Sequence, residues 1–202
     1  FGIVQPYAGN EHIVKVPEAD RRESVQPEIR KLQYAEKMLL FFRILSGAYI
    51  AVFRSTPMMV QLYIIFYGLF SVIKIPSVVI LGFIDLSRFI PGVVALALNS
   101  SAYVAEIIRA GILAVDGGQN EAARSLGLSS WQSMKLVVLP QAIKNILPAL
   151  ANELVTMVKE SSICSVLGMT ELIWGAKTVA TTTYKTLSPY VLAALVYFVI
   201  NY

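Results

Sequence analysis

Side chains that could perform catalysis or bind a metal ion are scarce in this sequence. The chain of 202 residues contains one histidine, His12, and one cysteine, Cys164. A zinc site normally takes three or four Cys, His or carboxylate ligands, and a Ser–His–Asp triad would have to use His12. We therefore expect no catalytic residue, no metal site and no internal disulfide. No glycine-rich phosphate-binding motif occurs, so we also expect no cofactor on this chain.

The polar side chains that could bind a ligand lie along one predicted membrane helix, residues 136–158, and just beyond its end. At about 100° of rotation per residue, five polar side chains share a face about 120° wide. They are Asn152, Glu153, Thr156, Lys159 and Glu160. A charge in the middle of a membrane is costly, so this face should contact another helix or a water-filled path. We interpret it as a candidate substrate site.

A second predicted helix, residues 89–115, has a matching face of small residues that includes Asn99 and Glu106. An ion pair with Arg109, three residues on, is the favoured interpretation of Glu106. For two other acids an alternative stays open: Glu160 could be a helix-end residue at the outer interface, and Glu153 could pair with another subunit. The candidate substrate-binding residues are Asn99, Asn152, Glu153, Thr156 and Glu160.

The elements that would position these residues belong to a membrane protein. Apolar residues make up 56% of the chain and charged residues 15%, against about 25% charged in a soluble domain. The charges concentrate in residues 1–37, which we interpret as a polar, solvated leader interrupted by Pro17 and Pro27. Residues 38–202 form the predicted membrane domain. The net charge of +4 comes from dispersed bases, which excludes a nucleic-acid-binding stripe.

The apolar runs predict an all-α, polytopic membrane protein. We expect spans over 58–73, 89–115, 136–158 and 187–202, and an outer loop with some helix over 161–187. Two segments look too short to span: 38–53 should be an amphipathic interfacial helix, and 75–84 a re-entrant or interfacial piece. The distribution of Lys and Arg places residues 116–135 in the cytoplasm.

Residues 116–140 carry local signals for a helical hairpin. Asp116 suits a helix N-cap, with Gln119 in capping-box position, and Gly127 suits the left-handed position after a helix end. Ser129 and Gln132 have the spacing of a second capping box. The first helix also presents a small apolar patch, Ala122, Ala123 and Leu126, that could enter a groove on a partner. A folded loop without a partner is the alternative.

The same segment resembles the EAA loop of bacterial ABC importer permeases, specifically the polar amino acid family. The motif is Glu121-Ala122-Ala123, three residues, Gly127, nine residues, Val137, one residue, and Leu139-Pro140. Three further segments resemble that family: 53–57 (FRSTP), 99–109 (NSSAYVAEIIR) and 159–162 (KESS). The resemblance covers about residues 45–200. Val137 stands where Ile is usual, and Ser55 where Gly is common.

The resemblance implies a type I ABC importer permease-like helical bundle in a bacterial inner membrane. In that family the loop docks on a cytoplasmic ATP-binding-cassette ATPase, which binds the ATP. Here Glu121 would make polar contacts, Ala122 and Ala123 would permit close approach, and Gly127 would set the turn. The further partners implied are a second permease subunit, identical or homologous, an extracytoplasmic amino-acid-binding protein, the lipid bilayer and an amino acid substrate.

The surplus of acids on the polar stripe favours an amino acid with a cationic side chain: arginine, lysine or histidine. Glutamine or another neutral polar amino acid is the alternative. A membrane-embedded scaffold or enzyme is a third interpretation, against which stands the absence of a histidine from the predicted spans.

Overall fold

The computed structural model describes the backbone of residues 18–202 and the side chains from Tyr34 onward. The chain forms two compact units, Phe1–Ser46 and Gly47–Tyr202. The described part of the first unit is helical and belongs to α1 (Glu18–Ser55), which runs on into the second unit. Its side chains from Tyr34 to Ser46 are all exposed. His12 and Pro17 lie outside the described residues.

Helix α1 corrects two expectations from the sequence. Part of the predicted leader is helical, and the helix continues through Pro27. Moreover, the helix does not begin at residue 38: its apolar part, Tyr34–Ser55, is 22 residues long, which is enough to cross a membrane. The prediction of a short interfacial helix rested on counting only residues 38–53. The length of this apolar segment is therefore compatible both with a helix at the membrane interface and with a helix that spans the membrane.

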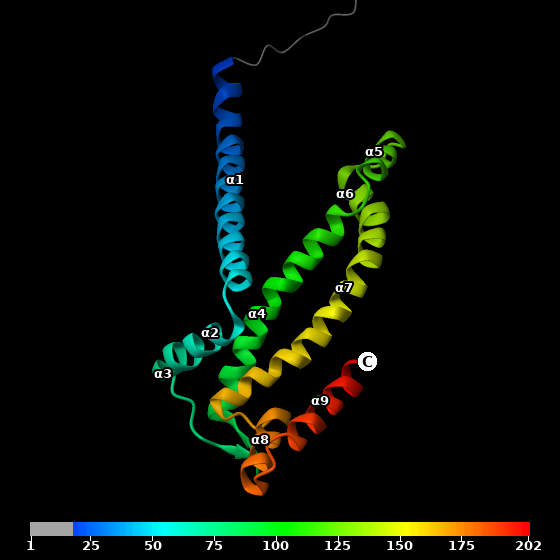
Figure 1. The fold of residues 1–202 in the computed structure, drawn as a ribbon. Helices are drawn as coiled ribbons and strands as arrows, with labels where there is room; N and C mark the ends of the chain where they lie inside the picture. The colour runs from blue at the N-terminus through cyan, green and yellow to red at the C-terminus, as the bar shows by residue number, and fades with distance from the viewer. Residues whose placement is uncertain (1–17) are drawn as a thin grey trace, which may run out of the picture. The chain divides into compact units, whose positions relative to one another are not determined.

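The second unit is almost entirely helical (Figure 1). Its elements are α2 (Met58–Tyr63), the π-helical η1 (Ile64–Leu69), α3 (Phe70–Val72), β1 (Val79–Ile80), β2 (Ile84–Asp85), α4 (Leu86–Leu113), α5 (Gly117–Ser125), α6 (Ser130–Ser133), the π-helical η2 (Met134–Val138), α7 (Leu139–Glu160), the 3₁₀ segment η3 (Ser161–Leu167), α8 (Leu172–Thr183) and α9 (Ser188–Asn201).

Two helical stretches of this unit are long and apolar enough to span a membrane. They are Leu86–Leu113, which is α4, and Ser130–Leu167, which runs from α6 to η3. The stretches Met58–Val72 and Ser188–Asn201 are apolar but shorter. Pro148 lies inside α7 without ending it. The predicted all-α, polytopic membrane fold is confirmed.

One segment differs from the expected interfacial helix or re-entrant piece. Within residues 75–84 the chain is extended, and β1 and β2 pair as a small antiparallel hairpin. This segment is rich in β-branched Ile and Val, which favour extended backbone, and it contains a Leu-Gly pair at the turn.

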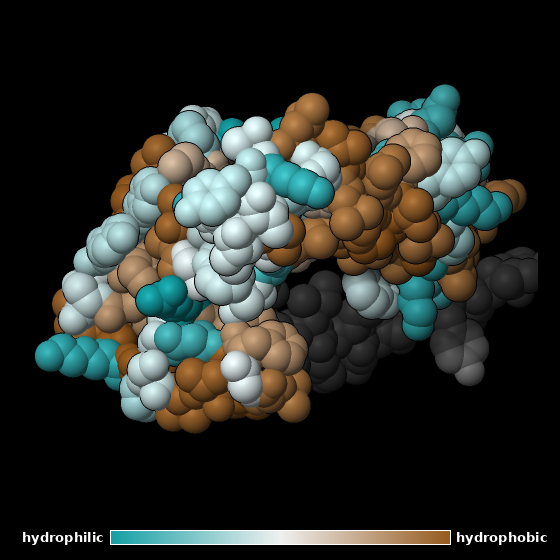
Figure 2. Space-filling view, turned by 60° about the horizontal axis from the view of Figure 1, so that its bottom comes forward, coloured by the Kyte–Doolittle hydropathy of each residue, from teal (hydrophilic) through white to brown (hydrophobic). Residues whose placement is uncertain are grey.

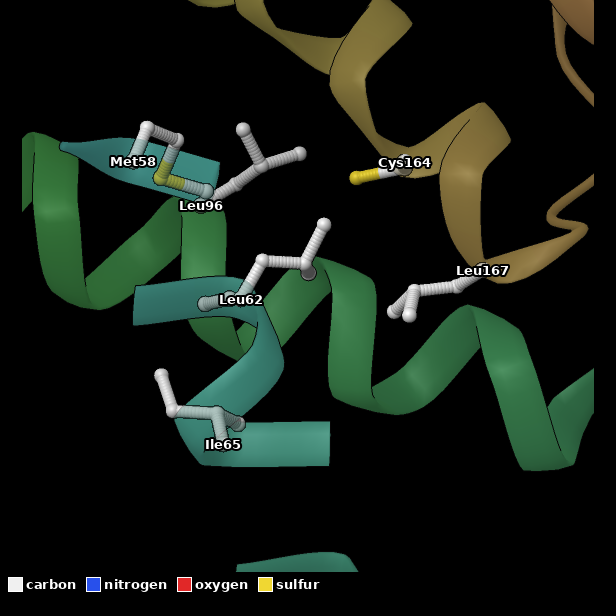
Figure 3. Close-up of a cluster of buried hydrophobic side chains, with 7 residues drawn as sticks. Met58, Leu62, Ile65, Leu96, Cys164 and Leu167 are labelled. Carbon is white, nitrogen blue, oxygen red and sulfur yellow. The ribbon is translucent and has the colours of Figure 1, made fainter. Parts of the chain in front are cut away.

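An apolar core of the second unit joins four elements, α2, η1, α4 and η3. Met58, Leu62 and Ile65 from α2 and η1 form one buried cluster with Leu96 of α4 and Cys164 of η3 (Figure 3). Leu62 and Cys164 are completely buried, so Cys164 is a packing residue.

Outside this core the surface is strongly apolar. Brown, hydrophobic side chains cover broad areas of the face in Figure 2, with smaller groups of teal polar side chains between them. On α9, for example, Leu192, Leu195, Phe198 and Val199 are more than half exposed. Such a surface is unstable in water and suits contact with lipid or with further membrane helices.

Candidate functional site

Residues 116–140 fold into a helical hairpin between the two long membrane helices. Asp116 caps α5, because its side chain accepts a hydrogen bond from the Gly118 backbone N–H at 2.6 Å. Gln119, expected in a capping box, accepts a hydrogen bond from the Gln141 side chain of α7 at 3.2 Å. The predicted helix start is therefore confirmed, but the predicted capping box does not form, because the Gln119 side chain bonds to α7 instead.

The turn of this 116–140 hairpin depends on Gly127. Its φ is +89°, in the region that side chains disfavour. The backbone N–H of Leu128 donates to the Ala123 carbonyl, and that of Gly127 donates to the Arg124 carbonyl. This pair of hydrogen bonds is the Schellman arrangement that ends a helix at a glycine. The predicted left-handed position of Gly127 is thus confirmed.

The second short helix is fixed to the first by side chains. Ser129 and Gln132 form the predicted capping box at the start of α6. The fully buried Ser133 donates from its hydroxyl to the Asn120 side chain at 2.7 Å, and Arg124 donates to the Ser130 hydroxyl. The hairpin is consequently a rigid unit, with more internal bonding than a simple connection requires.

The hairpin exposes only part of the patch that the sequence suggested. Ala123 is buried, with 4% of its surface exposed, and packs inside the hairpin. Glu121 and Ala122 are exposed, and Leu126 is 84% exposed. Trp131, which the sequence analysis did not single out, is 73% exposed. Its position inside the capping box of Ser129 and Gln132, in a polar segment, was the available signal. The presented surface therefore combines a carboxylate with two large apolar side chains.

One residue of the polar stripe on α7, Glu153, forms a side-chain hydrogen bond with α4. The hydroxyl of Ser100, a buried residue of α4, donates to Glu153 Oε1 at 2.9 Å. Glu153 itself is partly buried. Ser100 was missed because the bond joins residues 53 positions apart, which no local pattern reveals. This contact places one carboxylate in the packed interface of two membrane helices.

The other stripe residues differ in exposure. Asn152 is exposed, whereas Thr156 and Glu160 are partly buried. The Thr156 hydroxyl donates to the backbone carbonyl of Asn152 at 3.0 Å. Lys159, at the end of the stripe, lines a hollow of about 310 Å³ beside α9. Another hollow, of about 720 Å³, lies at the α8–α9 connection and is lined by none of the predicted site residues.

Asn99 has a different environment from the α7 stripe. Its side-chain amide donates to Gln61 Oε1 at 2.8 Å, and both residues are buried. Gln61 Nε2 in turn donates to the backbone carbonyls of Phe53 and Thr56 and to the Thr56 hydroxyl, at 2.8 to 2.9 Å. Asn99 thus holds the 53–57 turn against α4, and its donor group is already engaged.

Glu106 forms the ion pair expected from the sequence. Its carboxylate accepts two hydrogen bonds from Arg109, at 2.5 and 3.0 Å. Arg54 lies 3.7 Å away as a second cationic partner and also stacks over the Tyr103 ring, 5.6 Å from its centre. Two guanidinium groups therefore neutralise Glu106, which makes it a structural residue.

Within residues 34–202, no group of three or more His, Cys, Asp or Glu side chains is placed to hold a metal ion. The arrangement instead offers two features: a rigid, capped hairpin between membrane helices, and a carboxylate held by a hydroxyl inside the α4–α7 interface.

The chain is similar to known proteins. A family model described as "Binding-protein-dependent transport system inner membrane component" matches residues 36–202. The arginine transport system permease protein ArtQ of Bacillus subtilis (strain 168) is 47% identical over 156 residues, which cover 77% of this chain and 67% of that protein. A relative from Rickettsia conorii, named provisionally as the glutamine transport system permease protein GlnP, is 44% identical over 158 residues, covering 78% of this chain and 68% of the relative.

A solved structure agrees with the computed fold. The chain matches the crystal structure of an amino acid ABC transporter with histidines at a TM-score of 0.70 and 50% identity, over 78% of this chain and 69% of the other. The resemblance inferred from the EAA-like spacing is thus confirmed. The chain belongs to the family of binding-protein-dependent transport system inner membrane components, the permease subunits of ABC importers.

Proposed function

We propose that this chain is the membrane permease subunit of an ATP-driven importer for polar amino acids, and that it favours those with cationic side chains. It would reside in a bacterial inner membrane beside a second permease subunit, identical or homologous. A cytoplasmic ATPase would hydrolyse ATP, and an extracytoplasmic binding protein would deliver the amino acid.

The capped 116–140 hairpin supports the coupling part of this proposal. It is the only described connection between the two longest membrane helices of the second unit, so a force on it reaches both. Its exposed Glu121, Ala122, Leu126 and Trp131 offer polar and apolar contacts to an ATPase surface. Gly127 would set the shape of this surface, and the buried Ala123 would support it from inside.

The observation that carries the substrate preference is the carboxylate of Glu153. Transfer of an arginine or lysine through a membrane exposes its charges to a medium of low dielectric constant, where a fixed counter-ion is required. Glu153 lies within a membrane helix and receives one hydroxyl donor, Ser100, at 2.9 Å, so its charge is not neutralised by a described cation. Glu160 would add a second acid, and Asn152 and Thr156 would supply polar groups for the substrate backbone.

The names of the relatives support both the proposal and its rival. ArtQ is named for arginine, and the solved structure is described with histidines, whereas the Rickettsia relative is named for glutamine. A neutral amide substrate would need no counter-ion at Glu153, and that difference allows a direct test.

The test compares uptake of labelled arginine and labelled glutamine by the reconstituted transporter, in the parent and in Glu153→Gln. Loss of one charge-assisted contact, worth about 1.5–3 kcal/mol, should lower arginine uptake by roughly 10- to 100-fold and leave glutamine uptake much less affected. The matched control is Glu106→Gln, which removes a membrane-helix carboxylate that is already paired and should change both substrates alike.

Unchanged arginine uptake in Glu153→Gln would remove this residue from the site. Parent transporter that carries glutamine in preference to arginine would favour the neutral-substrate alternative instead.

A further inference from the structure

The short β-hairpin before α4 is an unusually apolar surface feature. Its backbone is paired: Val79 lies opposite Asp85, and Ile80 opposite Ile84. The Phe83 N–H donates to the Ile80 carbonyl at 3.3 Å, and the Leu86 N–H donates to the Val78 carbonyl at 3.0 Å. We call residues 78–86 the β-hairpin.

Most apolar side chains of the β-hairpin are exposed, whereas Ile84 and Leu86 at its base are partly buried. No charged residue occurs between Lys74 and Asp85. The exposed fractions of the apolar side chains are 47% for Val78, 56% for Val79, 44% for Ile80, 77% for Leu81 and 56% for Phe83. A contiguous apolar surface of this kind on a soluble protein would mark an interaction site.

The tip of the β-hairpin carries leucine where another residue type is usual. Leu81 has a φ of +55°, a left-handed conformation that Gly, Asn or Asp adopt far more readily. The next residue, Gly82, has a φ of +78°. The most exposed apolar side chain of the β-hairpin therefore occupies a position that its own backbone conformation disfavours.

The position of the β-hairpin along the chain sets its depth in the membrane. Helix α4 has 28 residues and is therefore about 42 Å long. A bilayer is about 30 Å thick across its hydrocarbon core and about 40–45 Å with its polar regions. A spanning α4 that is centred in the bilayer extends about 21 Å to each side, which places Leu86 at the level of the headgroups, on the side opposite to the 116–140 hairpin. The β-hairpin, which ends at Leu86, begins at that depth.

Several backbone groups of the β-hairpin and its base are satisfied by hydrogen bonds. The two strands of the β-hairpin bond to each other, and one further bond comes from outside: the Phe83 carbonyl accepts a hydrogen bond from the Thr170 hydroxyl at 2.5 Å. The base is fixed by Asp85, which accepts from the Ser87 N–H and hydroxyl and lies 3.8 Å from Arg88. A backbone N–H or C=O group that already has a hydrogen-bond partner costs less free energy to move from water into lipid. Lys74, exposed on the preceding segment, would face anionic headgroups.

We propose that the β-hairpin inserts its apolar tip, Leu81 and Phe83, into the boundary between headgroups and acyl chains of the outer leaflet. The inserted tip holds the first turn of α4 at a fixed depth. This inference concerns lipid contact and does not depend on which amino acid is carried.

The test places a nitroxide spin label at the tip. In a Cys164→Ser background, which has no other cysteine, Leu81→Cys and Phe83→Cys are labelled separately. The complete transporter is reconstituted in vesicles of phosphatidylethanolamine and phosphatidylglycerol. Collisions with oxygen, which concentrates in the bilayer, are compared with collisions with a water-soluble nickel chelate. The matched water-exposed control is Gly117→Cys on the 116–140 hairpin, where added side-chain atoms meet open space. Because the ATPase is proposed to cover this hairpin, the control is recorded on vesicles prepared without the ATPase.

At both tip positions we expect oxygen collisions to exceed nickel collisions, with the reverse at Gly117→Cys. A nickel-dominated signal at the tip, like that of the control, would mean exposure to water and would overturn the proposal. Low collision rates with both reagents would mean that protein covers the tip, either a second copy or the binding protein, and would overturn it equally.

Discussion

Two membrane carboxylates, Glu106 and Glu153, show how surroundings assign different roles to the same side chain. Glu106 is enclosed by Arg109 and Arg54, whereas Glu153 receives a single hydroxyl, that of Ser100. An ion-paired carboxylate contributes to structure, and a carboxylate with one neutral donor keeps its charge available. Because of this difference in partners, Glu153 belongs to the proposed substrate site and Glu106 does not.

The sequence predicted those residue contacts that are local. The spacing of three residues predicted the Glu106–Arg109 pair, because such residues are neighbours on a helix. The Arg54–Glu106, Gln61–Asn99 and Ser100–Glu153 contacts join different helices, so their partners depend on how the helices pack. The polar stripe was therefore visible from periodicity, but its partner residue Ser100 was not.

At Asn99 the structure predicts a loss of stability on substitution. Asn99→Leu would leave the buried Gln61 side chain without its donor, which should cost about 1–3 kcal/mol. Thermal unfolding of the purified protein in detergent measures this loss. The control is Asn152→Leu, since Asn152 is exposed. Parent-like unfolding of Asn99→Leu together with reduced substrate binding would show that Asn99 belongs to the substrate site instead.

Among the elements, the 116–140 hairpin was the most predictable. Its helix starts at Asp116 and Ser129 are fixed by side-chain hydrogen bonds, and its turn at Gly127 by backbone hydrogen bonds, between residues only two to five positions apart. The β-hairpin at 78–86 and the π-helical segments η1 and η2 were not predicted. Their backbone pattern follows from packing and cross-strand pairing, and apolar runs of this length carry no distinguishing period.

The positive φ of Gly127, in the turn of the 116–140 hairpin, leads to a specific prediction. Gly127→Val should strain the backbone by roughly 1–2 kcal/mol and disturb the surface offered to the ATPase, although the added Cβ itself meets open space. Gly127→Asn tolerates the same φ and serves as the control. We expect Gly127→Val to lower transport and the response of ATP hydrolysis to loaded binding protein, with normal membrane insertion. A full response in Gly127→Val would separate this turn from coupling.

At the scale of the whole molecule, composition alone predicted a polytopic helical membrane protein, because a chain with 15% charged residues cannot cover its surface with polar groups. The number of membrane crossings was less predictable. Residues 34–55 and 58–72 lie close to the minimum length of a span, where a few residues change the interpretation.

Orientation gives a prediction for the whole chain. Residues 116–135 should be cytoplasmic and residues 161–187 outside. Single cysteines at Ser129 and Thr182, both exposed, are introduced in a Cys164→Ser background and treated with an impermeant reagent on intact cells. We expect labelling at Thr182 only, and labelling at Ser129 after the cells are opened. The opposite pattern on intact cells would reverse the topology.

The close approach of α4 and α7 has a mechanical consequence. At Gly111 a side chain would overlap Ile146, and at Ser100 a hydrogen bond reaches Glu153, so the two helices are fastened at two levels about 16 Å apart. Two contacts at separate levels oppose sliding of one helix along the other. If the pair tilts as a unit by about 5° at one end, the other end of a rod about 40 Å long moves by about 3.5 Å. A movement imposed on the 116–140 hairpin would therefore be passed to the opposite ends of α4 and α7.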